Sequence, residues 1–382
     1  MEAQMRQTSI FRNVMIVIFC LAIGCIGGLF IAYYLGGGFQ HPMAQGTQIE
    51  ISDGADVAAV AQAYQDAVVS IKVVSKTNSD SFSLGSGVCV HAGGYIVTNY
   101  HVIAQSKSNP IYEIYTFLNG DQQKGYKSEL LWANDDLDLA IIKSSYTDIR
   151  YAKMKDRSFA CSDGDKLKIG DEVIAIGTPI EMNLQNTTTF GRVNGLNRVG
   201  AANGDVTTTR IYEYLIQHQA TINSGNSGGP LIDSKGYVVG INSCSMVEDK
   251  NDNYVAEINF AVPIYPIIKI IDGVVESYEN RRDYVDPIPA ITCQDKVFSK
   301  YISGAYSGEG VLIKTNPYSA IGSLTLLKND VILHMTYNKK TYDINNVYDF
   351  YYNCLRAGKG ASVTFVVERA GAKIETSAVV LP

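Results

Sequence analysis

Ser227 stands in a loop whose residue types and spacing suit nucleophilic catalysis. It belongs to the run Ser-Gly-Asn-Ser-Gly-Gly-Pro at residues 224–230, which leads into the apolar segment Pro-Leu-Ile-Asp. The surrounding glycines predict a tight turn that exposes the serine hydroxyl. In such a turn the backbone N–H groups of Gly225 and Ser227 can point at one spot and stabilise an oxyanion. The loop therefore predicts acyl transfer through a serine.

A serine hydroxyl is a poor nucleophile by itself, so it needs a general base, and the base needs an orienting acid. His101 is the candidate base, because it lies at the end of a predicted strand that contains Ile-Val-Thr. Asp138 is the candidate acid, since it stands at the mouth of an apolar strand, where a partly buried carboxylate needs a partner. The three residues occur in the chain order His, Asp, Ser.

Each of these residues has a simpler explanation when it is taken alone. A serine in a glycine turn can be only a turn residue, and Asp135 and Asp136 could cap a turn with Asp138 merely beside them. His218 is the rival base, but it lies inside a predicted strand that leads to the serine loop. The chain order, the positions at strand ends and the Gly-Asn-Ser-Gly-Gly-Pro run together favour a triad. The other histidines are interpreted as structural or solvated: His41, His91 and His334.

These candidates sit among many short apolar runs separated by turn residues, which predicts a β-sandwich or β-barrel. Before the runs, the apolar spacing from Val57 to Val68 predicts a short amphipathic helix, and after them residues 266–278 predict a closing helix. Cys89 and Cys244 fall within predicted strands and are interpreted as core thiols. The runs are VVSIKVV, GVCV, YIVT, LDLAIIK, EVIAIG, PLID, YVVGIN and INFAVP.

The N-terminal region has a different composition. From Val14 to Leu35 there are 22 residues without a charge, enough for a helix that crosses a bilayer. Arg6 and Arg12 precede this run, and after it no Lys or Arg appears until Lys72. The positive-inside rule therefore predicts a cytoplasmic N-terminus, residues 1–13, a membrane anchor, residues 14–35, and an external remainder. Residues 36–54, rich in Gly and polar residues, are expected to form a linker.

Composition excludes several classes of protein. The net charge of −6 argues against a nucleic-acid binder, which usually presents a basic face. Seven cysteines in 382 residues are too few for a disulfide scaffold, and the absence of a Cys-x-x-Cys pair argues against structural zinc. We therefore expect no metal and no cofactor.

A cluster of Pro and charged residues at 281–290 marks a domain boundary, and the last hundred residues form a second unit. That unit contains the apolar run GVLI at 310–313, the run NDVILHM at 329–335, a predicted helix near 345–356 and a final predicted strand at 362–369.

The motifs in residues 55–278 resemble the HtrA/Deg family of trypsin-like serine proteases. The resemblance implies two six-stranded β-barrels with the site between them, with His101 as base, Asp138 as its orienter and Ser227 as nucleophile. Residues 284–382 resemble a PDZ domain, an α+β fold. One anchor, one protease domain and one PDZ domain are most similar to the DegS subtype. The segments that carry the resemblance are GSGV (85–88), TNYHV (98–102), DLAIIK (138–143), AIGTP (175–179), QATINSGNSGGPLID (219–233), GIN (240–242) and INFAVP (258–263).

The resemblance also carries expectations about partners and place. It implies a serine endopeptidase of the bacterial inner membrane whose protease and PDZ domains face the periplasm, acting on misfolded or regulatory envelope proteins. A homotrimer is expected, because the apolar stripe Val57–Val68 is available for packing on a neighbour. The substrate pocket is expected at Ile222, Asn223, Ile241 and Asn242, where no carboxylate favours a basic substrate residue.

Two departures from the family pattern bear on regulation. Residues 198–214 lengthen a loop region that governs activation in this family. A peptide-binding turn is expected at Tyr284, Val285, Asp286 and Ile288, but Pro287 removes a backbone donor there, so recognition of a terminal carboxylate should be weakened. The alternative function is a catalytically silent HtrA-like chaperone or PDZ scaffold.

Overall fold

A computed structural model of the chain describes residues 46–52, 54–78, 82–135, 137–155, 165–201, 211–245, 258–279, 292–295, 310–315, 326–358 and 360–381. The predicted anchor at 14–35 and the predicted peptide-binding turn with Tyr284, Val285, Asp286 and Ile288 lie outside these ranges. Within them, no helix is both long and apolar enough to cross a membrane.

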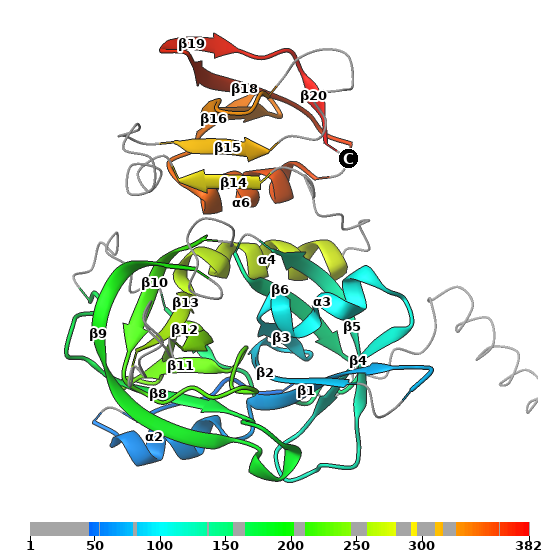
Figure 1. The fold of residues 1–382 in the computed structure, drawn as a ribbon, viewed down its shortest axis with the longest axis vertical. Helices are drawn as coiled ribbons and strands as arrows, with labels where there is room; N and C mark the ends of the chain where they lie inside the picture. Colours follow the sequence, from blue (N-terminus) through cyan, green and yellow to red (C-terminus); the bar gives the residue numbers. More distant parts are fainter. Residues whose placement is uncertain are drawn as a thin grey trace, which may run out of the picture. The chain divides into compact units, whose positions relative to one another are not determined.

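The first half of the predicted protease domain is a closed antiparallel barrel of six strands (Figure 1). The strands follow the order β1-β2-β3-β6-β5-β4, and their buried β-branched residues fill the barrel. A helix, α3 (Tyr100–Ser108), follows β3 directly. The strands are β1 (Val68–Ser75), β2 (Phe82–His91), β3 (Tyr95–Thr98), β4 (Tyr112–Phe117), β5 (Tyr126–Asn134) and β6 (Leu139–Ser144).

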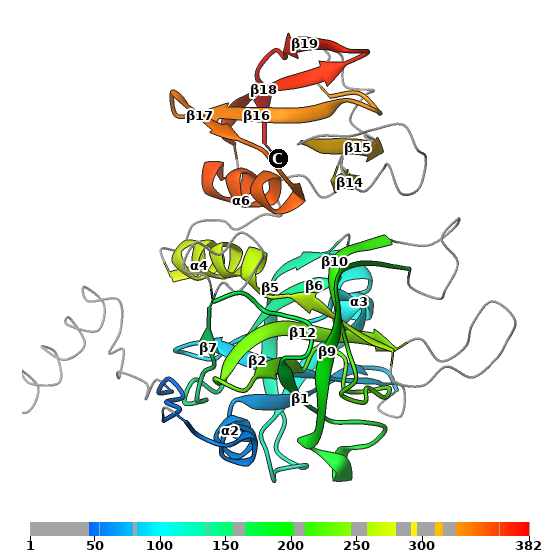
Figure 2. The same ribbon diagram turned by 90° about the vertical axis from the view of Figure 1, so that its left-hand side faces the viewer.

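The second half is a seven-stranded sheet of order β11-β8-β9-β10-β13-β12-β7, in which β11 also pairs with β12 (Figures 1 and 2). That pairing closes six of the strands into a second barrel, so the expected double-barrel fold is confirmed. A 3-10 turn, η1 (Met182–Leu184), lies between β8 and β9. The strands are β7 (Lys153–Met154), β8 (Glu172–Gly177), β9 (Thr187–Ala201), β10 (Ile211–His218), β11 (Pro230–Asp233), β12 (Tyr237–Ser245) and β13 (Asn259–Pro263).

Helix α2 (Val57–Tyr64) begins where the apolar spacing predicts it, with Asp56 as its N-cap. Its apolar residues Val60 and Tyr64 are fully buried, and the Tyr64 hydroxyl donates to Gly236 O at 2.6 Å. The stripe is therefore used within its own chain. The premise that it is available to a neighbouring copy was wrong, because spacing alone does not reveal which surface a helix face covers.

Residues 36–54 were expected to form a linker, but from residue 46 onward the chain is packed against the rest of the structure. Gly46 N–H donates to Thr147 O at 3.2 Å, Ile49 N–H donates to Tyr151 O at 2.9 Å, and Ile49 is fully buried. A Cβ at Gly46 would lie 1.5 Å from Ile149 O, so only glycine fits there. From residue 46 onward the chain is thus docked on residues 147–151, the segment that connects β6 to β7.

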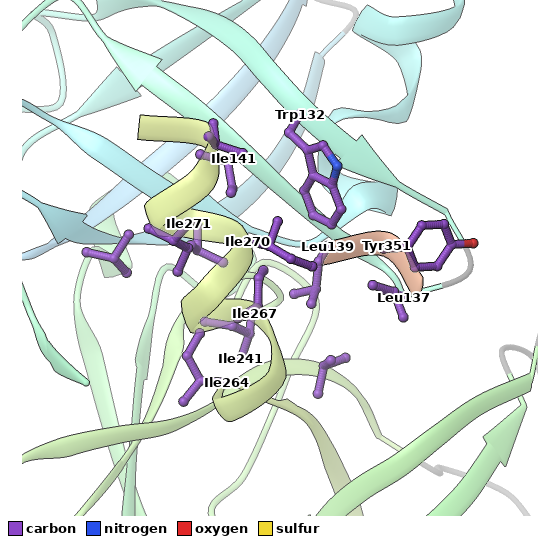
Figure 3. Close-up of a cluster of buried hydrophobic side chains, with 14 of the residues drawn as sticks. Trp132, Leu137, Leu139, Ile141, Ile241, Ile264, Ile267, Ile270, Ile271 and Tyr351 are labelled. Atoms are coloured by element: carbon purple, nitrogen blue, oxygen red, sulfur yellow. The ribbon is translucent and has the colours of Figure 1, made fainter. Parts of the chain in front are cut away.

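Helix α4 (Tyr265–Glu279) closes the domain, as residues 266–278 predict. Its isoleucines Ile267 and Ile270 are fully buried in a cluster that includes Trp132 and Leu139 of the first barrel and Ile241 of the second (Figure 3). Side chains from both barrels therefore share one core with α4, which fixes the two barrels against each other.

The C-terminal unit has a sheet of order β14-β15-β16-β18-β19, and helix α6 (Val347–Ala357) belongs to its described residues. Phe350 of α6 and Phe365 of β18 are fully buried, and Arg369 forms a bidentate ion pair with buried Asp330. The predicted apolar runs and helix of this unit are confirmed. The strands are β14 (Thr292–Asp295), β15 (Val311–Thr315), β16 (Val331–Tyr337), β17 (Lys340–Asp343), β18 (Ser362–Arg369), β19 (Ala372–Glu375) and β20 (Val379–Val380).

Candidate active site

His101 lies in the first turn of α3. The sequence placed it at a strand end, but β3 stops at Thr98 and Asn99 is already the N-cap of the helix. The imidazole Nδ1 lies 3.0 Å from both carboxylate oxygens of Asp138, and the His101 backbone N–H donates to Asp138 Oδ1 at 3.1 Å. The predicted base and acid are therefore in direct contact.

Asp138 is 1% exposed and directly precedes β6. Its φ of 51° is left-handed, a conformation that Asp tolerates better than most residues. The Asn99 side chain donates to Asp138 O at 2.8 Å, which fixes this backbone position against the start of α3. The loop before β6 thus delivers the carboxylate to the imidazole.

The pKa of His101 is raised above its usual value. Burial lowers this pKa, but the hydrogen bond and the negative charge of Asp138 together outweigh that effect. When neutral His101 carries its proton on Nδ1, that N–H donates a hydrogen bond to the carboxylate, and Nε2 is free to accept a proton from another group. His101 keeps 45% of its side chain exposed, so a substrate group can reach it.

Ser243 in β12 is the second side chain on the carboxylate. Its Oγ donates to Asp138 Oδ2 at 2.7 Å, and Ser243 is 4% exposed. Sequence reasoning missed this residue. The partners are separated by 105 residues and lie on different barrels, so no local pattern indicates the contact.

Replacing Ser243 with alanine is expected to lower kcat for peptide hydrolysis by roughly 10-fold, with little change in KM. The Asp138 carboxylate would lose one of its charge-assisted hydrogen bonds, of a kind that contributes about 1.5–3 kcal/mol. Steady-state kinetics on a fluorogenic peptide provide the measurement. A Ser245→Ala variant, two residues along the same strand, serves as the control, and equal rates for the two variants would contradict the assignment.

The Ser227 hydroxyl donates to Ser243 O at 2.8 Å. Among the described residues, no hydrogen bond joins it to His101. The hydroxyl proton would have to leave Ser243 O before Nε2 could accept it, and catalytic contacts of this kind commonly tighten only when substrate binds. Ser243 therefore meets the acid through its side chain and the nucleophile through its backbone.

The two predicted oxyanion donors are oriented by the carbonyls that precede them. Ile180 N–H donates to Ser224 O at 2.7 Å, and Gly229 N–H donates to Asn226 O at 3.0 Å. In a trans peptide the N–H points opposite to the C=O. The N–H groups of Gly225 and Ser227 therefore face away from these contacts. Gly225 has a φ of 100°, a conformation that glycine adopts without strain.

The residues predicted for the substrate pocket are mostly buried in the cores. Ile241 is fully buried in the cluster with α4 (Figure 3), and Ile222 is 4% exposed in the core of the second barrel. The Asn242 side chain donates to Pro230 O at 2.8 Å, while Asn223 is exposed. Asn242 and the two isoleucines thus contribute to the scaffold of the nucleophile loop.

Two other titratable side chains, His218 and Cys244, are less suited to catalysis. His218 is fully buried, and burial lowers its pKa to about 3. Burial, followed by the charge of Asp138, raises the pKa of Cys244 to about 11, so this thiol stays protonated. Asp136 lies outside the described residues. No cluster of His, Cys, Asp or Glu in the described ranges is suited to hold a metal.

Comparisons with known proteins match this geometry. The trypsin-like peptidase domain family matches residues 85–241. The chain carries a trypsin-like peptidase domain and has HtrA-type serine proteases as relatives. It is 24% identical to serine protease Do-like HtrB of Bacillus subtilis (strain 168), across 83% of this chain and 69% of HtrB. It is 30% identical to a probable periplasmic serine endoprotease, DegP-like, of Chlamydia pneumoniae, across 68% of this chain. The chain spans 51% of that relative's length.

Solved structures of HtrA-type proteases share the fold. The HtrA-type protease AlgW with a decapeptide superposes with a TM-score of 0.51 at 22% identity, covering 86% of this chain and 99% of AlgW. The serine endoprotease from Yersinia pestis gives a TM-score of 0.51 at 23% identity, covering 87% of this chain and all of that one (100%). The resemblance to the HtrA family is confirmed, and the names of the relatives support a serine endopeptidase. The DegS subtype remains a prediction.

Proposed function

We propose that this HtrA-type domain hydrolyses peptide bonds through Ser227, His101 and Asp138. The observation that carries the proposal is the pair of contacts made by Ser243, whose hydroxyl binds the Asp138 carboxylate while its carbonyl binds the Ser227 hydroxyl. These contacts support Ser227 as a nucleophile that works with a buried acid, since the Asp138 carboxylate lies 3.0 Å from the imidazole. The alternative of a silent chaperone needs none of these contacts.

The reaction would follow from this geometry. Ser227 Oγ attacks the carbonyl carbon of the substrate while His101 Nε2 takes the hydroxyl proton. The negative oxygen that results is stabilised by the N–H groups of Gly225 and Ser227. The C–N bond then breaks as His101 returns the proton to the leaving amine. Water, activated by the same nitrogen, finally attacks the acyl ester and frees Ser227.

A fluorophosphonate probe tests the proposed nucleophile. We expect the full chain to be labelled at Ser227, with fluoride leaving as the Oγ–P bond forms, and to cleave casein. A Ser227→Ala variant should do neither. Casein binding without cleavage or labelling would favour the chaperone or PDZ scaffold instead.

The P1 residue of the substrate is expected to be small or medium and aliphatic. Neither Thr221–Asn223 nor Gly240–Cys244 contains a carboxylate, so these segments offer no partner for a basic P1 residue, and an unpaired charge removed from water costs several kcal/mol. Cleavage-site profiling on a peptide library provides the measurement. A profile dominated by Arg or Lys at P1 would contradict it.

We further propose that the chain is anchored in a bacterial inner membrane with the protease in the periplasm. The uncharged run Val14–Leu35 and the preceding Arg6 and Arg12 support this. Relatives named as periplasmic endoproteases agree with an envelope location. Protease added to intact spheroplasts is expected to digest residues 55–382, whereas protection of that portion would place it in the cytoplasm.

The C-terminal unit is proposed to act as a PDZ-like regulator, and the chain as a homotrimer. Peptide binding to residues 284–382 would shift the populations of two conformations around residues 181–214, a region that contains β9 and the start of β10. Activity and peptide affinity should therefore rise together. Both can be measured on the full chain with and without unfolded-protein peptides.

The homotrimer now rests on the family resemblance alone, because the apolar face of α2 is buried within its own chain. The mass of the detergent-solubilised chain tests the trimer.

A further inference from the structure

Ser86 of β2 holds the nucleophile loop at two points. Its Oγ donates to Gly225 O at 2.7 Å, and its backbone N–H donates to Ser227 O at 2.8 Å. Gly225 and Ser227 are the two residues whose N–H groups form the proposed oxyanion hole. One fully buried serine of the first barrel thus contacts both of them.

The Ser86 hydroxyl belongs to a buried polar network with satisfied partners. It accepts from Thr178 N–H at 2.8 Å, and the Ser86 carbonyl accepts from Thr98 Oγ1 at 2.7 Å. Thr178 Oγ1 in turn is hydrogen-bonded to Ser70 Oγ at 2.6 Å. All four residues are 1% exposed or less. A network that is buried and fully paired restricts its members to one arrangement.

The nucleophile loop packs closely against the backbone around Ser86, so it cannot move away from Ser86 easily. A Cβ at Gly228 would lie 2.1 Å from Ser86 O, and a Cβ at Gly225 would lie 2.2 Å from Thr178 O. A Cβ at Gly177 would lie 2.9 Å from Ser86 Oγ. The glycines of this region are therefore required by the approach of the loop to β2 and to the residues after β8.

Loss of the hydroxyl would leave Gly225 O buried without its donor, which is costly for a carbonyl. The peptide after Gly225 could relieve that cost by rotating, since glycine permits many backbone conformations. That rotation would turn the Asn226 N–H away from Asn223 O, to which it donates at 3.0 Å, and so loosen the turn that lies between the two donors. An oxyanion hole is effective only when its donors are already oriented. Loss of the Ser86 hydroxyl should therefore lower kcat more than it raises KM.

We propose that Ser86 is a positioning residue for the oxyanion hole. Its hydroxyl and its N–H hold Gly225 and Ser227 so that both backbone donors face the substrate carbonyl. The inference rests on the serine-protease function proposed above. It assigns a role to the serine of the Gly-Ser-Gly-Val run at 85–88, which the triad alone leaves without one.

The test compares Ser86→Ala with Ser144→Ala in the full chain. Ser144 is a matched control, because it lies in the same barrel, is 1% exposed, and is hydrogen-bonded to Thr116 Oγ1 at 2.9 Å. Each variant deletes one buried hydroxyl. Among the described residues, the Ser144 side chain makes no hydrogen bond to the nucleophile loop.

Ser86→Ala is expected to lower kcat about 10- to 100-fold while KM changes by less than about twofold. The rate constant for fluorophosphonate labelling should fall by a similar factor, since that reaction also needs the donors for its phosphoryl oxygen. The acid limb of the pH profile should stay in place, because His101 and Asp138 are untouched. Ser144→Ala should change none of these rates by more than about twofold.

Equal kcat values for the two variants, or a loss confined to KM, would overturn the proposal. A loss of rate that merely follows the folded fraction, measured by circular dichroism, would do the same. Thr98→Val is a second variant that removes the donor to Ser86 O, and a smaller loss with the same kinetic signature is expected. If the unmodified chain neither cleaves peptides nor reacts with the probe, the proposed protease function is wrong. If the unmodified chain is active but Ser86→Ala behaves like Ser144→Ala, only the role proposed for Ser86 is wrong.

Discussion

Replacing Ser227 with alanine is expected to lower kcat for peptide hydrolysis by roughly 10⁴- to 10⁶-fold. The proposed acyl ester forms on this hydroxyl oxygen, and alanine offers no oxygen in its place. Active-site-titrated kinetics on a fluorogenic peptide provide the measurement. Ser224→Ala is the matched control, because that exposed serine belongs to the same loop and contributes only its carbonyl. Comparable losses in both variants would point to a damaged loop rather than a lost nucleophile.

Asp138→Asn should be nearly as damaging, at roughly 10⁴-fold, because an amide cannot accept the Nδ1 proton in the same way and favours the wrong tautomer. The low-pH side of the pH–activity profile also tests the role of Asp138. Asp138 raises the pKa of His101, so wild-type activity should fall with decreasing pH from a midpoint above 6.5, the ordinary histidine value. In Asp138→Asn any residual activity should have a lower midpoint, because the charge that favours the imidazolium is gone. Full activity in this variant would identify Asp135 or Asp136 as the orienter.

The sequence predicted the turns and strands that are determined by neighbouring residues in the chain. The glycine-rich run predicted the turn at Ser227. Short apolar runs predicted β1, β2, β3, β6, β8, β11, β12 and β13, whereas β4, β5, β7 and β9 were not among them. The contact of His101 with Asp138 followed from the family resemblance and is present at 3.0 Å. His101 was misplaced by a few residues, because a helix that starts immediately after a strand leaves no turn residues to mark the change.

Other features depend on contacts between distant segments. Ser243 reaches Asp138 across 105 residues, and Ser86 reaches Gly225 across 139. Neither serine differs by type from the many serines on the surface. Ile241 was expected in the substrate pocket from its closeness in sequence to the loop, yet strand alternation directs it to the core beneath α4. Burial of this kind is decided by tertiary packing.

We expect His218 to make the free energy of unfolding strongly dependent on pH. It ends β10, is fully buried, and neither ring nitrogen has a hydrogen-bond partner among the described residues. Burial lowers its pKa from 6.5 to about 3 in the folded chain. Well above pH 6.5 the imidazole is neutral in both states, so protonation of His218 makes no contribution to the free energy of unfolding there. Below pH 6.5 the unfolded chain gains a proton that the folded chain refuses.

The free energy of unfolding should therefore fall as pH drops from 6.5, and this contribution should level off near pH 3. At about 1.4 kcal/mol per pH unit, the loss attributable to His218 is about 3 kcal/mol between pH 7 and pH 4, and roughly 4–5 kcal/mol in full. Urea unfolding of the wild type and of His218→Leu at several pH values isolates this part, because the carboxylates contribute equally to both. His91→Gln, at a histidine that is only half-buried, controls for the loss of a histidine as such. A difference between His218→Leu and wild type that stays constant from pH 7 to pH 4 would show that the folded barrel accommodates the imidazolium.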